Sequence, residues 1–179
     1  MHFIFTGTES TFKSSLSERV AAELHLDHAP EFARTFLQDQ KSEIDFENFP
    51  KTLFRKIVQG QLATEQAYQY FNPISKTCIF DTDHLTLEVW GQDAWNDSSP
   101  ILKTVLQHNI YLLCAPNTTW VDDGMRVDKH RRLALHEKYI RLLEETNAKY
   151  HVLTAQTYDE RLTEARNIIT GHLNIRPRG

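Results

Sequence analysis

The sequence predicts an α/β fold, in which a mostly parallel sheet lies between two layers of helices. Four short apolar runs are typical of buried strands, at residues 3–6, 78–81, 110–114 and 151–154. Longer segments with helical spacing separate these runs, and strands that alternate with helices are joined by right-handed crossovers. The predicted sheet is therefore parallel, and ligands are expected beyond the carboxyl ends of its strands.

The first apolar run leads into a glycine turn and then into a helical pattern that contains Leu16, Val20 and Leu24. The turn follows the phosphate-binding pattern G-x-x-x-x-G-K-[ST], in which backbone amides surround phosphates, the lysine reaches the terminal phosphates and the hydroxyl binds magnesium. Phe12 replaces the second glycine of the pattern. The alternative is an ordinary strand, turn and helix with surface polar residues. The residues expected around the phosphates are Gly7, Thr8, Glu9, Ser10, Thr11, Phe12, Lys13, Ser14 and Ser15.

The remaining elements follow in order along the chain. A short strand is predicted at residues 26–29, ended by Pro30, and helical spacing is found at residues 53–62, 135–142 and 162–169. Residues 174–179 are expected to form a loose basic tail. No repeat or Gly/Ser linker interrupts the alternation, so residues 1–179 are predicted to form a single domain.

Two carboxylates, Asp81 and Asp83, follow the predicted strand at residues 78–81. A carboxylate at such a strand end holds magnesium in proteins with phosphate-binding loops, together with a hydroxyl such as that of Ser14. Alternate positions point in different directions, so Asp81 is expected at the metal and Asp83 at the substrate. A solvated Asp-Thr-Asp turn is the alternative.

Glu31 and Arg34 lie three residues apart and share one face if this segment is helical. A glutamate in this position is suited to accept a hydroxyl proton, and an arginine is suited to bind a phosphate. A surface ion pair in a first helical turn explains the pair equally well.

Residues 116–132 form a polar segment with one glycine and a cluster of basic residues, as expected of a lid over phosphates. Arg126, Arg131 and Arg132 are its candidate phosphate ligands, because arginine charge stabilises a phosphoryl group during transfer. A loop and helix with a solvated basic face is the alternative.

Trp90 is a candidate for stacking on a flat ring of a substrate, and Trp120 for apolar contact with a ligand or with the domain body. Core packing is the commoner fate of tryptophan.

Composition limits the possible functions. The chain has 179 residues, 40% of them hydrophobic, and a formal net charge of −4, which argues against nonspecific nucleic-acid binding. No membrane-spanning run and no signal peptide are recognisable, so a cytoplasmic location and no membrane partner are expected. Cys78 and Cys114 are expected to be buried free thiols, with a disulfide as the weaker alternative. Oligomeric state is left open, a homo-oligomer included.

Taken together, four segments resemble the ribosylnicotinamide kinase domain of NadR-type NAD-salvage proteins, which are phosphate-loop kinases. They are G-T-E-S-T-F-K-S-S-L, P-E-F-A-R-T-F-L, I-F-D-T-D-H-L-T, and L-L-C-A-P-N-T-T-W-V-D-D-G-M-R followed by H-R-R. The resemblance extends over almost the whole chain.

The resemblance implies transfer of the ATP γ-phosphate to the ribose 5'-hydroxyl of nicotinamide riboside. It implies a three-layer P-loop fold, an arginine-containing lid, and ATP and Mg²⁺ as cofactors. Lys13 and Ser14 would serve ATP and magnesium, and Asp81 the metal or the ribose. The residue that orients the attacking hydroxyl stays open among Glu31, Asp81 and Asp83.

Phe12 is the departure from this family, which has glycine at that position. If the backbone needs a positive φ there, an L-residue costs about 1–2 kcal/mol. The ring either crowds the phosphates or turns away and packs beneath the loop. Two alternatives to a kinase follow: a nucleotide-binding sensor without turnover and, ranked last, an ATPase that acts on a macromolecule.

Overall fold

The computed structural model describes residues 1–38, 43–71, 77–105 and 107–174. Its centre is a five-stranded sheet of order β2-β3-β1-β4-β5, in which every neighbouring pair is parallel. The strands are β1 (His2–Gly7), β2 (Asp27–Ala29), β3 (Cys78–Asp81), β4 (Asn109–Cys114) and β5 (Lys149–Leu153). The predicted α/β class and parallel sheet are confirmed, with strand ends that differ by one or two residues.

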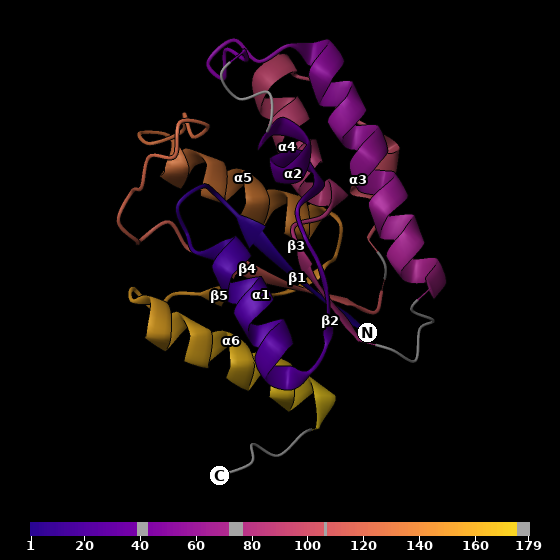
Figure 1. Cartoon of the computed structure of the whole chain (residues 1–179), viewed down its shortest axis with the longest axis vertical. Helices are drawn as coiled ribbons and strands as arrows, with labels where there is room; N and C mark the ends of the chain where they lie inside the picture. Colours follow the sequence, from indigo (N-terminus) through magenta and orange to yellow (C-terminus); the bar gives the residue numbers. More distant parts are fainter. Residues whose placement is uncertain (39–42, 72–76, 106, 175–179) are drawn as a thin grey trace.

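Helices cover both faces of the sheet (Figure 1). The helices are α1 (Lys13–Leu24), α2 (Phe32–Gln38), α3 (Lys51–Phe71), α4 (His84–Trp95), α5 (Arg132–Glu145) and α6 (Tyr158–Leu173), with a 3₁₀ turn η1 at Pro100–Lys103. Helices α1 and α6 pack on one face, and α4 and α5 pack on the other. The result is the predicted three-layer arrangement.

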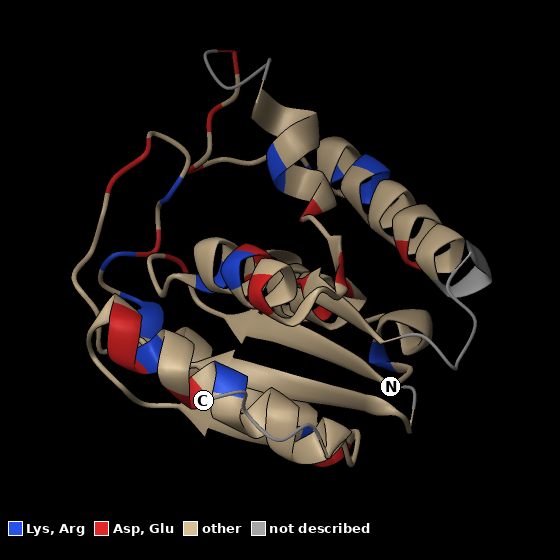
Figure 2. Cartoon of the chain, turned by 60° about the horizontal axis from the view of Figure 1, so that its bottom comes forward, with Lys and Arg blue, Asp and Glu red and all other residues tan. Residues whose placement is uncertain are grey.

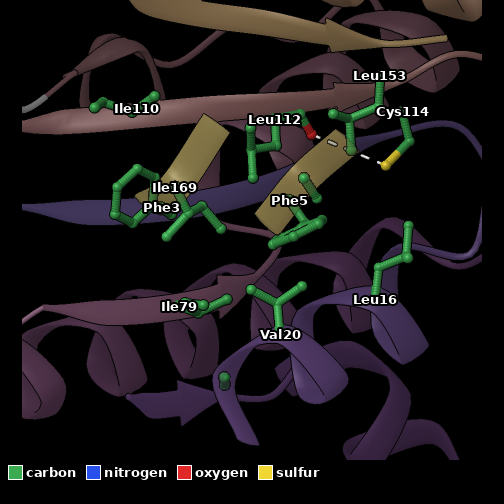
Figure 3. Close-up of a cluster of buried hydrophobic side chains, with 12 residues drawn as sticks. Phe3, Phe5, Leu16, Val20, Ile79, Ile110, Leu112, Cys114, Leu153 and Ile169 are labelled. Atoms are coloured by element: carbon green, nitrogen blue, oxygen red, sulfur yellow. Dashed lines mark hydrogen bonds between the residues drawn. The ribbon is translucent and has the colours of Figure 1, made fainter. Parts of the chain in front are cut away.

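The core between the sheet, α1 and α6 consists of interlocking apolar side chains. Phe5, Leu16 and Val20 point toward Leu112 and Ile169 in the space between these elements (Figure 3). Because β1 is buried along its whole length, the loop that follows it starts from a rigid position.

A third apolar cluster joins α2, α3 and α4 beside the main sheet. It includes Phe54 and Trp95, whose ring centroids are 4.8 Å apart. Lys and Arg lie beside Asp and Glu on the same helices and on the loop before α5 (Figure 2). None of the described helices is both long and apolar enough to cross a membrane.

Both cysteines are buried and neither forms a disulfide among the described residues, as expected. Residues 175–179 of the predicted tail lie outside the described residues. The prediction of a single domain over the whole chain stays a prediction.

A buried ion pair joins α3 to the start of α4. Glu65 accepts a hydrogen bond from the His84 backbone amide at 2.7 Å, and its other oxygen pairs with the His84 ring. The second ring nitrogen of His84 contacts the Thr104 carbonyl at 2.8 Å. Burial alone would lower the pKa of His84, but the hydrogen bond that its ring donates to Glu65 and the charge of Asp83 raise the pKa to about 10.

Glu65→Gln should lower the free energy of unfolding by about 3 kcal/mol at pH 6, because it leaves a buried imidazolium without its partner. The pKa of His84 is higher in the folded than in the unfolded state. The stabilisation is therefore complete below pH 6.5 and is lost as the pH rises through about 10. Urea unfolding at pH 6 and pH 10 measures this loss, with the exposed Glu145→Gln as control. An equal loss at both pH values would contradict the assignment.

Candidate phosphate-binding site

The candidate site begins where β1, the central strand, ends at Gly7. Gly7 has a φ of 124°, and a Cβ atom there would lie 2.8 Å from the Cys114 carbonyl oxygen on the neighbouring strand. Only glycine fits this close approach. The chain then turns through residues 8–12 and enters α1 at Lys13.

Phe12 has the left-handed backbone that the sequence left in question, with a φ of 68°. Its half-buried ring packs on Tyr158 of α6 in an edge-to-face arrangement, with centroids 5.7 Å apart. The Tyr158 hydroxyl also donates a hydrogen bond to the Ser15 carbonyl at 3.2 Å. The ring is therefore anchored on α6, and the glycine-like backbone is retained despite its strain.

Lys13, Ser14 and Asp81 come together at the start of α1. The Lys13 ammonium donates to the Thr8 carbonyl at 2.7 Å, across the mouth of the loop. Asp81 is 3% exposed, and its Oδ1 has no hydrogen-bond partner among the described residues. Burial raises the pKa of Asp81, while a hydrogen bond with Ser14 and the charge of Lys13 oppose the rise.

The pair of Asp81 and Ser14 fits a magnesium ion. Mg²⁺ binds carboxylate and hydroxyl oxygens, and the buried Asp81 oxygen without a partner is such a donor.

Glu31 and Arg34 lie at the carboxyl end of β2, two strands from the loop. Burial, and after it the charge of Asp81, raise the pKa of Glu31 to about 7, and the charges of Lys13 and Arg34 oppose this rise. The Arg34 Nε atom is 3.8 Å from the Glu31 carboxylate, and its Nη1 is 3.1 Å from Asp123. Glu31 is therefore close enough to Lys13 and Asp81 for their charges to act on it.

The loop between β4 and α5, residues 115–131, is docked on the phosphate loop through two of the phosphate loop's own side chains. Glu9 accepts from the amides of Val127 and Asp128, both at 3.1 Å. The Ser10 hydroxyl donates to the Val121 carbonyl at 3.0 Å and accepts from the Val121 amide at 3.1 Å. The 115–131 loop and the phosphate loop are therefore one connected structure.

The three candidate arginines take different positions. Arg126 lies at the phosphate loop, with Nη1 3.3 Å from the Ser10 hydroxyl and Nε 3.3 Å from Asp123. Arg131 is exposed and pairs with Asp93 of α4 and with Asp128. Arg132 is 8% exposed and lies behind the loop.

Asp83 is buried, as Asp81 is, but it differs from Asp81 in its hydrogen bonds. One oxygen accepts from the Leu85 amide at 3.1 Å, which caps α4, and the other accepts from the Tyr111 hydroxyl at 2.7 Å. The change of direction occurs at Thr82, which has a φ of 64°. Since both Asp83 oxygens have internal partners, its position favours a structural role over substrate contact.

Trp90 packs in the third apolar cluster, together with Phe32 and Met125, so it lies at the boundary of α4, α2 and the 115–131 loop. The Arg132 guanidinium lies over the Trp120 ring, 5.9 Å from the ring centroid. Neither ring is fully buried.

Sequence reasoning missed Arg161 and Tyr158 of α6. Arg161 is fully buried and donates to the Thr11 carbonyl of the phosphate loop at 3.2 Å. The helical spacing of α6 places both residues on one face, three positions apart. Nothing local in the sequence identifies the partner that this face contacts.

The sheet order and a phosphate-type loop after the central strand define the fold of the phosphate-loop kinases. A family model described as an AAA domain matches residues 2–161, and the chain belongs to this family.

Solved structures with the same fold include a NadR protein in complex with NR, with a TM-score of 0.79 and 17% identity. The match covers 99% of this chain and 51% of the NadR chain, so this chain spans about half the length of that protein. The resemblance to NadR-type proteins seen in the motifs is thereby confirmed.

Two nucleotide-handling enzymes of similar length also match. Thymidylate kinase from Candida albicans has a TM-score of 0.68 and 12% identity, over 98% of this chain and 93% of that one. Deoxyadenosine kinase from M. mycoides with bound dATP has a TM-score of 0.60 and 14% identity, over 97% of this chain and 100% of that one.

Phe12→Ala and Phe12→Gly form a matched pair that tests the loop geometry. Both remove the contact with Tyr158, but only glycine adopts a positive φ without strain. Phe12→Ala should therefore be less stable than Phe12→Gly by about 1 kcal/mol in chemical unfolding. Equal stabilities, or a more stable alanine variant, would mean that position 12 does not need the left-handed backbone.

Proposed function

We propose that the chain is an ATP-dependent kinase that phosphorylates the 5'-hydroxyl of a ribonucleoside, with nicotinamide riboside as the expected acceptor. The observation that carries this proposal is the grouping of Lys13, Ser14 and the unpartnered Asp81 oxygen at the loop after the central strand. Two solved NadR structures support it, one in complex with NR and one in complex with NAD and AMP-PNP.

In this proposal the loop amides and Lys13 bind the phosphates of ATP. Lys13 would exchange its contact with the Thr8 carbonyl for the terminal phosphates. Asp81 and Ser14 would hold Mg²⁺, which neutralises charge on the β- and γ-phosphates when bound. Arg126, already at Ser10, would add positive charge from the 115–131 loop.

The acceptor hydroxyl would lie on the β2 side of the loop, near Glu31 and Arg34. Glu31 is the favoured proton acceptor, because its pKa of about 7 suits general base catalysis at neutral pH. Arg34 would orient the acceptor or the transferred phosphate. Trp90 and Trp120 are proposed to contact the acceptor base, and Asp83 to support the site from within.

A nucleotide sensor without turnover is the second candidate. One observation favours it: Arg131 is held by Asp93, and Arg126 by Asp123, so neither guanidinium is free of carboxylates. A cytoplasmic location and a homo-oligomer stay predictions.

Lys13→Ala tests the kinase proposal. Incubation with MgATP and nicotinamide riboside should yield nicotinamide mononucleotide with the wild type. The variant should lose about 10²–10³-fold in kcat, as expected when a charge-stabilising donor is removed. Product formation is followed by mass spectrometry, with Lys149→Ala as control, since Lys149 is exposed at the amino end of β5, away from the carboxyl ends of the strands. Nucleotide binding by the wild type without product over long incubation would support the sensor instead.

The pH profile tests Glu31 as the base. The carboxylate form is the active one, so kcat/KM should rise as the pH increases through about 7 and level off above it. Glu31→Gln should lower kcat by about 10²–10⁴-fold and abolish this rise. The exposed Glu18→Gln is the matched control. A wild-type profile that is flat between pH 5.5 and 8.5 would exclude Glu31 from this role.

A further inference from the structure

Arg161, in the first turns of α6, is fully buried, and each of its three side-chain nitrogen atoms donates to an uncharged oxygen. Nη1 donates to the Thr11 and Ala115 carbonyls at 3.2 and 3.0 Å, Nε donates to the Ala155 carbonyl at 2.8 Å, and Nη2 donates to Asn117 Oδ1. No carboxylate of the described residues forms an ion pair with Arg161. Burial of a charge without a counter-charge is costly, so this arrangement calls for a reason.

The nearest acidic side chain along α6 is engaged elsewhere. Glu164 accepts hydrogen bonds from the Thr154 and Ala155 amides at 3.0–3.1 Å. Glu164 interacts with Arg161 by long-range electrostatics, without a hydrogen bond between the two side chains among those described. Within the described part of the chain, the positive charge of Arg161 therefore has no negatively charged hydrogen-bond partner.

Arg132 is a second buried arginine that donates to backbone carbonyls, one of which belongs to the residue before Thr11. It donates to the Thr118 carbonyl at 2.9 Å and to the Ser10 carbonyl at 3.2 Å. Two buried guanidinium groups thus bind two consecutive carbonyls of the phosphate loop, Ser10 and Thr11.

These contacts fix the direction of the loop amides. In a planar trans peptide the carbonyl and the following N–H point in opposite directions. Because the Ser10 and Thr11 carbonyls face the arginines, the amides of Thr11 and Phe12 face the other way. Among the described residues, none accepts a hydrogen bond from these two amides. Successive free amides of this kind form an anion-binding concavity.

We propose that Arg161 is a positioning residue of the phosphate site, which acts through the Thr11 carbonyl and places a positive charge behind the loop. Arg132 does the same through Ser10. The anion that balances these charges is the phosphate chain of a bound nucleotide. The proposal rests on the proposed nucleotide site and extends it to a helix that does not touch the ligand.

The chain offers a matched control on the same helix. The Arg166 side chain is 42% exposed and its guanidinium is 3.5 Å from Glu23, so Arg166 shares the chemistry of Arg161 but forms no hydrogen bond with the phosphate loop among the described residues. Calorimetric titrations should compare Arg161→Gln, Arg161→Lys and Arg166→Gln with the wild type. The probes are AMP-PNP, inorganic pyrophosphate and adenosine.

Arg161→Gln should weaken binding of AMP-PNP and pyrophosphate at least 10-fold and change adenosine binding less than 2-fold. Arg161→Lys retains the charge and should recover more than half of the loss on a logarithmic scale. Arg166→Gln should bind all probes like the wild type. The loss should persist in 0.5 M salt, because buried charges are screened little. Equal weakening of adenosine and AMP-PNP, or a lysine variant no better than glutamine, would overturn the proposal.

A structural role alone and a failure of the proposed function give different results. If Arg161→Gln does not fold, Arg161→Lys and Arg132→Lys replace it in the titrations. In both variants the preference for phosphate-bearing probes over adenosine should be smaller than in the wild type. If the wild type binds no probe, the nucleotide site fails. Amide hydrogen exchange across residues 8–14 then decides whether Arg161 positions the loop: exchange that is faster in Arg161→Gln than in Arg166→Gln supports it, and equal exchange refutes it.

Discussion

The loop after Gly7 enters α1 through a left-handed backbone conformation at Phe12, and an aromatic residue adopts this conformation at a cost. That cost is of order 1–2 kcal/mol, which glycine would avoid. Helix α6 supplies the compensation: Tyr158 packs against the Phe12 ring, and Arg161 binds the preceding carbonyl. The phosphate loop of this chain therefore depends on its last helix, which lies beside α1 on the same face of the sheet (Figure 1).

The same loop is also held by the 115–131 segment. Glu9 and Ser10 occupy loop positions where the phosphate-binding pattern fixes no residue type, and here both bind the backbone of that segment. Arg126 meets the loop at Ser10, so its position is set by the contacts that dock the segment. Glu9 and Ser10 therefore join the 115–131 segment to the loop, and Asp123 of that segment pairs with both Arg126 and Arg34.

The sequence was sufficient for the fold, because apolar strands alternate with helices and each strand is buried. It was also sufficient to find the loop and Asp81, since spacing along one strand, turn and helix is local information. The sequence assigned Asp83 to the substrate, but the turn at Thr82 places Asp83 at the cap of α4 and leaves Asp81 with an oxygen that has no hydrogen-bond partner among the described residues. The arginines illustrate the same limit: Arg131 and Arg132 are neighbours in sequence, yet one is exposed and the other is buried behind the loop. The role of Arg161 could not be predicted from the sequence, because it depends on a contact with Thr11, which lies 150 positions earlier in the chain.

A crystal structure with Mg²⁺ and AMP-PNP tests the geometry of the phosphate loop most directly. We expect the β-phosphate within hydrogen-bond distance of the Thr11 and Phe12 amides, with the Phe12 ring still packed on Tyr158. A Phe12 ring that occupies the cradle, with the nucleotide phosphates bound elsewhere or not at all, would contradict this expectation.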